Sequence, residues 1–114
     1  MSRRSSALRL AEAAPLFAAL GDETRLRLVS RLCSEGPLSI ARLSEGTEIT
    51  RQGITKHLHA LAGAGLVKDS PQGRERIWEL EPRRLAKARE CLEQISAQWD
   101  AAIGRLQDFL EKNP

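Results

Sequence analysis

Polar side chains suited to nucleic-acid contacts surround a short apolar stripe in TRQGITKHLHALAGAGLV, residues 50–67. The stripe, Ile54, Leu58 and Leu61, recurs at the spacing of an α-helix. The opposite face of such a helix carries glutamine, lysine and histidine, which can bond to base edges or phosphates. Free N–H groups at the helix start also suit a phosphate. The DNA-contacting residues predicted in this segment are Thr50, Arg51, Gln52, Thr55, Lys56 and His59.

The same polar face has a simpler interpretation, because any helix on a protein surface exposes a solvated side. The two histidines differ within it. His57 lies nearer the apolar stripe, so we expect it to pack or to form a hydrogen bond that holds the helix. His59 lies farther from the stripe and is expected to contact DNA. Residues at i and i+2 cannot share one helix face, so this pair alone predicts no zinc site.

Two more basic residues follow a predicted turn in SPQGRER. Alternating apolar runs on both sides of this turn predict a β-hairpin, and Gly73 permits its tight end. Arg74 and Arg76 can then enter a minor groove or bind phosphate, which defines a wing over residues 70–76. Arg74 is the better candidate. For Arg76 the alternative, a charge that keeps an exposed strand edge from pairing, stays open.

Residues that cap or break helices predict the bounds of the helices that position these side chains. Asp22, Ser39 and Thr50 are candidate N-caps, and Pro15 interrupts or begins the first helix. The expected elements are a first helix from Leu8 to Gly21, a second from Asp22 to Gly36, a short third from Ser39 to Gly46, a recognition helix over 50–63, strands over 66–69 and 74–80, and a last helix from Pro82. The chain is therefore predicted to be mainly α with a small β-hairpin, in winged helix-turn-helix order.

The last helix is too long for a small domain. It spans roughly 30 residues, or ~45 Å at the α-helical rise. Its apolar residues step by three and four along its whole length, so something must cover them, and a second copy of the chain is the economical cover. The first helix is the expected companion. The predicted dimer interface consists of Leu10, Phe17, Leu92, Ile95, Trp99, Ile103, Leu106 and Leu110.

Length and composition limit the class of protein. The 114 residues predict one domain: a disordered basic arm over 1–7, a winged helix-turn-helix core with the first dimer helix over 8–82, and a dimerisation helix over 83–112. Hydrophobic residues make up 41% and charged residues 29%, as in soluble globular proteins, and the net charge of +3 suits nucleic acid. No apolar run reaches the ~20 residues of a membrane span and no signal peptide is visible, so we expect a cytoplasmic protein.

The motifs ALGDETRLRLV, PLSIARL, ITKHLHALAGAGLV and GRERIWEL resemble those of the ArsR-type (arsenical-resistance-repressor-like) transcriptional regulators. The resemblance covers about residues 16–82, and the ending CLEQISAQWDAAIGRLQDFLE resembles a branch of which many members lack a metal site. It implies a homodimer, a fourth helix in the major groove, a wing against the flanking backbone and repression at a palindromic operator. In this family a ligand at a second site usually releases the DNA.

The trigger is not evident from the residues. Ser39 and Ala41 stand where metal-sensing members carry a C-x-C, and the last helix has no histidine, so no metal ligands or cofactor are predicted. Cys33 and Cys91 lie on the two helices that carry sensing cysteines in thiol-responsive members, although Ser30 occupies the sensing position of the second helix. A redox-responsive repressor therefore stays open beside two inert cysteines, with Cys33 expected in a buried stripe.

Two rival functions are weaker. No paired carboxylates, nucleophile elbow or phosphate loop indicate an enzyme. A winged-helix module for protein assembly would use the same fold, but it would favour apolar groups on the exposed face of the fourth helix. The sequence therefore predicts a homodimeric, sequence-specific DNA-binding regulator, most simply a repressor, with an effector that is unknown.

Overall fold

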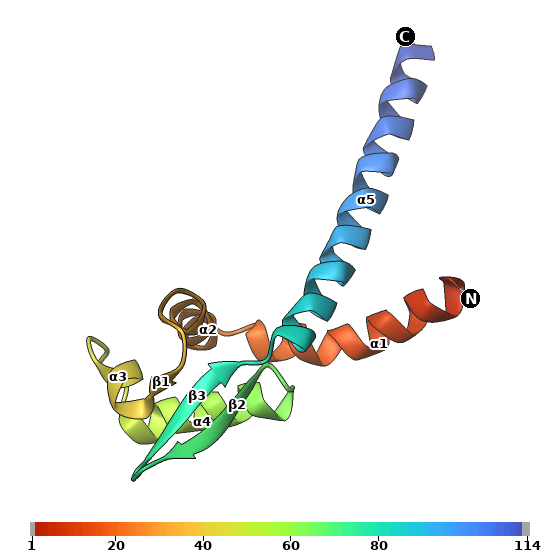
Figure 1. Cartoon of the computed structure of the whole chain (residues 1–114). Coiled ribbons are helices and arrows are strands. Elements are labelled where there is room, and N and C mark those ends of the chain that lie inside the picture. Colours follow the sequence, from red (N-terminus) through yellow and green to blue (C-terminus); the bar gives the residue numbers. More distant parts are fainter. Residues whose placement is uncertain (1, 113–114) are drawn as a thin grey trace.

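A computed structural model of the chain describes residues 2–112. Within them, helices, a short sheet and one long terminal helix follow the predicted order (Figure 1). The mainly α winged helix-turn-helix fold is confirmed. The elements are α1 (Ser2–Leu20), α2 (Glu23–Glu35), β1 (Leu38–Ser39), α3 (Ile40–Ser44), α4 (Arg51–Gly63), β2 (Val67–Gln72), β3 (Glu75–Leu80) and α5 (Pro82–Lys112).

Three side-chain caps begin the helices of the central unit. The carboxylate of Asp22 accepts a hydrogen bond from the N–H of Arg25 at 3.1 Å, at the start of α2. Ser39 caps α3 and Thr50 caps α4 in the same way, with N···O distances of 3.2 and 3.0 Å. Each cap satisfies an N–H that has no partner within its helix. All three predicted caps are confirmed.

The sheet has one strand more than predicted. β3 lies in the middle, with β2 and the two-residue β1 antiparallel to it on either side. β1 pairs Leu38 with Trp78 and Ser39 with Ile77, and two residues are too few for an alternating pattern to reveal them. The hairpin itself is confirmed. Its ladder extends to Gln72, beyond the predicted end at residue 69, and Gly73 turns it with a φ of 66°.

The core lies where α4 meets α2, α3 and the sheet. Leu43, Leu58, Leu61 and Leu66 are fully buried, and Trp78 of β3 closes the core from the sheet side with 3% of its surface exposed. Each fully buried leucine contributes about 1.5–3 kcal/mol of transfer free energy. Leu16 and Ala88 join the same cluster from α1 and α5. The central unit therefore anchors one end of each outer helix.

The first helix is longer than predicted. α1 begins at Ser2, so it covers the segment 2–7 that the sequence predicted as a disordered arm, while Met1 lies outside the described residues. It also runs through Pro15 without ending. Alanine, leucine and arginine favour helix, α1 packs on α5, and Ala13 and Leu16 of α1 are buried. Tertiary packing thus outweighs the break expected at proline.

The last helix leaves the central unit and projects away from it (Figure 1). Only Ala88 and Cys91 are buried along its 31 residues. From Leu92 onward its large apolar side chains are exposed, and Trp99 reaches 67% exposure. An ion pair of 2.9 Å between Glu12 and Lys87 holds the inner part of α5 to α1. No helix within residues 2–112 is long and apolar enough to cross a membrane.

Candidate nucleic-acid interface

The polar face of α4 is exposed at its N-terminal half. Ile54, Leu58 and Leu61 are buried, as the stripe predicted, and this burial turns the polar residues outward. Arg51, Gln52 and Lys56 are exposed, and their side chains form no hydrogen bond or ion pair within the described part of the chain. Three unpartnered donors at the start of a helix can meet phosphates and base edges together.

The two threonines of this segment are already engaged. Thr50 uses its hydroxyl as the N-cap of α4, and the Thr55 hydroxyl donates to the carbonyl of Arg51 at 2.8 Å. The proton of the Thr55 hydroxyl is therefore already used within α4. Both residues lie where the sequence placed them, on or beside the polar face.

The histidines differ in their surroundings. His57 is half-buried, and its Nδ1 lies 3.8 Å from the Asp22 carboxylate that caps α2, in line with a role in holding the helix. The ring of His59 lies 5.8 Å from that of Trp78, centroid to centroid. His59 is exposed but sits beside the sheet instead of opposite the core, so it has a protein partner that the helical projection did not show. Its contact with DNA stays a prediction.

The two wing arginines are also distinct. Arg74 lies exposed at the turn between β2 and β3, with no side-chain partner among residues 2–112. Arg76 instead pairs with Asp69 on the neighbouring strand. This hydrogen bond holds the pKa of the Asp69 carboxyl below its usual range and raises the pKa of Arg76. Arg74 is therefore available to a nucleic acid, whereas Arg76 is engaged by its strand neighbour, and contact of either arginine with DNA stays a prediction.

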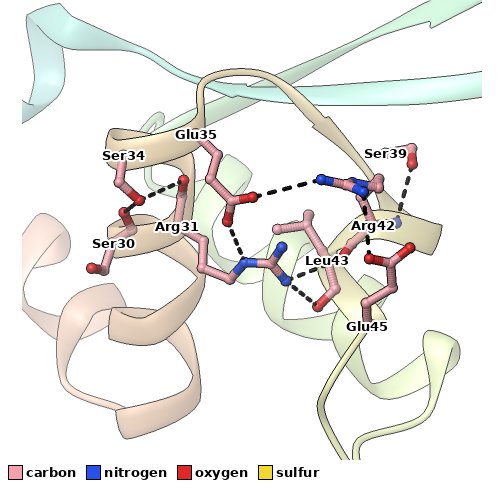
Figure 2. Close-up of polar contacts among 8 residues, drawn as sticks. All are labelled: Ser30, Arg31, Ser34, Glu35, Ser39, Arg42, Leu43 and Glu45. Carbon is pink, nitrogen blue, oxygen red and sulfur yellow. Dashed lines mark hydrogen bonds and ion pairs between the residues drawn. The ribbon is translucent and has the colours of Figure 1, made fainter.

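Polar contacts join α2 and α3 in a network that was not predicted from the sequence (Figure 2). Arg31 donates from Nε to Glu35 at 2.8 Å and from Nη1 to the carbonyls of Arg42 and Leu43 at 3.0 and 3.2 Å. The hydrogen bond between Arg31 and Glu35 lowers the pKa of the Glu35 carboxyl and raises the pKa of the Arg31 guanidinium. The carbonyl of Arg42 also accepts from the N–H of Glu45, and Arg31 adds a side-chain cap to this end of α3. It thereby ties together the two helices that support α4.

The role of Gly53, at the start of α4, was also not predicted from the sequence. A Cβ at Gly53 would lie 2.9 Å from Cγ2 of Ile49 and 3.3 Å from the Thr50 hydroxyl. The loop from α3 can therefore approach α4 closely only because position 53 has no side chain. The adjacent polar residues could not reveal this contact, since Ile49 has no periodic relation to the helix.

The two cysteines differ in exposure, and Cys33 is not buried as predicted. Cys33 is exposed although the sequence placed it in a buried stripe, and Cys91 is buried with 3% of its surface exposed. The buried side of α2 consists of Leu28, Val29 and Leu32, and it leaves Cys33 exposed. Both thiols are free. No group of three potential metal ligands occurs within the described residues.

Most of the predicted dimer face is uncovered. Leu10 and the α5 residues Leu92, Ile95, Trp99, Ile103, Leu106 and Leu110 are all exposed. Phe17 differs, because it is partly buried and packs against the core of its own chain. The exposed set therefore forms a stripe along α5 with one member on α1.

Comparisons with known proteins agree with this architecture. A helix-turn-helix domain model matches residues 20–69. The HTH-type transcriptional regulator Rv2034 of Mycobacterium tuberculosis is 36% identical over 75% of this chain and 76% of its own length. The arsenical resistance operon repressor of Escherichia coli is 33% identical over 69% of this chain and 68% of its own length.

Among solved structures, an ArsR-like transcriptional regulator from Rhodococcus sp. RHA1 is 36% identical, with a TM-score of 0.72. The alignment covers 88% of this chain and 93% of that one. These relatives are transcriptional regulators rather than enzymes. The chain is therefore a DNA-binding transcriptional regulator that belongs to the ArsR family.

Proposed function

We propose that the protein is a homodimeric repressor that acts in the cytoplasm and binds a roughly palindromic operator. The observation that carries this proposal is the set of exposed, unpartnered side chains Arg51, Gln52 and Lys56 at the start of α4. Gln52 can bond bidentately to adenine, and Lys56 can reach guanine or a phosphate. Arg74 contacts the flanking backbone from the wing. Repression follows from occupying a promoter.

The dimer in this proposal forms through α5. Leu92, Trp99 and Leu106 recur every seven residues, which is the spacing of a seam between paired helices. Exposed apolar stripes of this length are rare on monomers. A solved winged helix-turn-helix domain from Mycobacterium bovis, Mb0332, is described as homodimeric and shares the fold, with 23% identity and a TM-score of 0.63. Two copies would place two copies of α4 on successive half-sites.

The alternatives fit these observations less well. A protein-assembly module would expose apolar groups on α4, whereas the exposed half of this helix carries arginine, glutamine and lysine. A thiol-responsive repressor would use the exposed Cys33, but Cys91 is buried, so the pair has unequal access to an oxidant. The hypothesis of a thiol-responsive repressor therefore depends on the reactivity of Cys33 alone.

Fluorescence anisotropy of the reduced protein tests the proposal. The duplex upstream of its own reading frame is compared with a scrambled duplex across a salt series. We expect specific binding that is ~10³-fold or more tighter on the first duplex at physiological salt. Equal, weak binding to duplexes that tile the neighbouring genome would contradict a sequence-reading repressor. A repeat after oxidation decides whether Cys33 matters.

Two variants assign the contacts. Gln52→Ala should cost about 1–3 kcal/mol and relax the preference at one base pair. Lys56→Ala should lower affinity, and a reduction of the salt slope by about 1 would assign it to a phosphate. Lys112→Ala, at the far end of α5, removes the same charge and should change neither quantity. Both α4 variants should stay dimeric.

A further inference from the structure

A groove lies between α2, α3 and the loop that joins α3 to α4. Its volume is about 660 Å³, within the range of roughly 300–1,000 Å³ that small-molecule sites occupy. Leu28, Leu43 and Ile54 form its apolar floor, and Ile49 stands at its edge. Arg31, which also lines it, is fixed by its bonds to Glu35 and to the end of α3 (Figure 2). The groove therefore has a wall held in place by hydrogen bonds.

The charges around the groove are unequal. Three of its four charged lining residues are neutralised by neighbours: Arg27 by Glu23, Arg31 by Glu35 and Glu45 by Arg42, at 2.7, 2.8 and 3.6 Å. The fourth, Glu48, has no side-chain hydrogen bond or ion pair within the described part of the chain. A carboxylate beside an apolar floor complements a positive charge on an apolar body.

We propose that this groove binds a small amphipathic organic cation. Its apolar body packs on Leu28, Leu43 and Ile54, and its ammonium group meets the carboxylate of Glu48. Thr24 and Ser30 also line the groove, and their hydroxyls add polar groups to its wall on α2. This site goes beyond the proposed function, since none of its lining residues belongs to the predicted DNA-contacting set.

The location couples such a ligand to the recognition helix. The groove is lined by α2 and α3, by the loop before Thr50 and, through Ile54, by α4 itself. Ile49 is already in close approach to the start of α4 because Gly53 has no side chain. A ligand against Ile49 and Ile54 therefore contacts the segment that sets the position of Arg51 and Gln52.

Three probes with a shared aromatic body separate charge from apolar burial: phenethylammonium, 2-phenylethanol and 3-phenylpropionate. Each is titrated into the full chain while backbone amide NMR shifts are followed. We expect the largest shifts at residues 24–31 and 45–50. The ammonium should bind about two- to five-fold more tightly than the alcohol, as expected for one exposed ion pair, and the carboxylate should bind least.

Two variants complete the test. Glu48→Gln should remove the preference for the ammonium over the alcohol, whereas Glu90→Gln, an exposed carboxylate on α5 with the same change in charge, should keep it. Ser30→Phe should fill the groove and abolish the shifts for all three probes, with an unchanged melting temperature as evidence of folding. Equal affinity for the three probes, absence of shifts, or shifts centred outside the groove would overturn the proposal. The anisotropy assay uses no probe, so its outcome is independent of this one.

Discussion

The helix-turn-helix unit and the outer part of α5 use similar apolar residues in opposite ways. In the central unit every large aliphatic side chain of the α4 stripe is buried within one chain. On α5 the leucines, isoleucines and tryptophan beyond Cys91 are exposed along one stripe. The same chemistry thus gives intrachain stability in one region and leaves surface for association in the other. A single substitution type should have different consequences in the two places.

Leu58→Ala should have the largest effect. It removes a fully buried side chain from the centre of the core, so we expect a loss of about 2–5 kcal/mol in the free energy of unfolding. Leu106→Ala on α5 should change the free energy of unfolding of the dilute monomer by about 0.5 kcal/mol or less. Denaturant titration at low protein concentration measures both. Equal losses would mean that the two regions do not differ as described.

Trp99→Ala tests the opposite side of the comparison. Removing the most exposed aromatic residue of α5 should weaken the dimer by about 2 kcal/mol or more if it is a central interface residue. Helix content should stay unchanged, because Trp99 contributes little to intrachain burial. Sedimentation across a concentration series measures the shift. An unchanged dissociation constant of the dimer would contradict an interface formed by α5.

Arg31→Met tests whether the position of α3 depends on the polar network. Losing the bonds to Glu35 and to two carbonyls should cost about 1–2 kcal/mol, since the guanidinium is partly exposed. DNA affinity should fall with the dimer intact, because α3 supports α4. Arg89→Met removes the exposed pair with Glu93 on α5 and should change stability little. Similar losses of stability in both variants would contradict the role of Arg31 in holding α3.

The smallest effect concerns the junction between the two regions. The hydrogen bond from Lys87 holds the pKa of the Glu12 carboxyl below its ordinary value. A lowered folded-state pKa contributes stability that is complete above the ordinary value and is lost as the pH falls through the lowered one. Glu12→Gln should therefore flatten the acid limb of the stability curve slightly. A steeper limb in this variant would contradict the sign of the shift.

Local features of the fold were predictable from the sequence, and contacts between distant residues were not. The caps at Asp22, Ser39 and Thr50 act within three residues, so their pattern is visible in the chain. The partners of Arg31 on α3 lie 11 and 12 residues away, and no periodicity links them. The third strand, β1, was not predicted because it has only two residues and pairs with β3 far along the chain.

Helical projection did not show the surroundings of two candidate site residues, Cys33 and His59. It included Cys33 in the apolar face of α2, but the buried residues of that helix are Leu28, Val29 and Leu32, which leaves Cys33 exposed. It placed His59 opposite the core, but it could not include the neighbouring β3, where Trp78 meets the histidine ring. Gln52 and Lys56 were placed on the outer face and Arg51 on its flank, and all three are exposed because the helix itself determines their exposure.

The two tryptophans lie in the two regions of this comparison. Trp78 is 3% exposed inside the sheet beside His59, and Trp99 is 67% exposed on α5. Their fluorescence should consequently differ in emission wavelength and in access to a dissolved quencher. Trp78 would respond to melting of the helix-turn-helix unit, whereas Trp99 would shift when another molecule covers α5. The chain thus carries its own pair of optical reporters, and each can be recorded without a label.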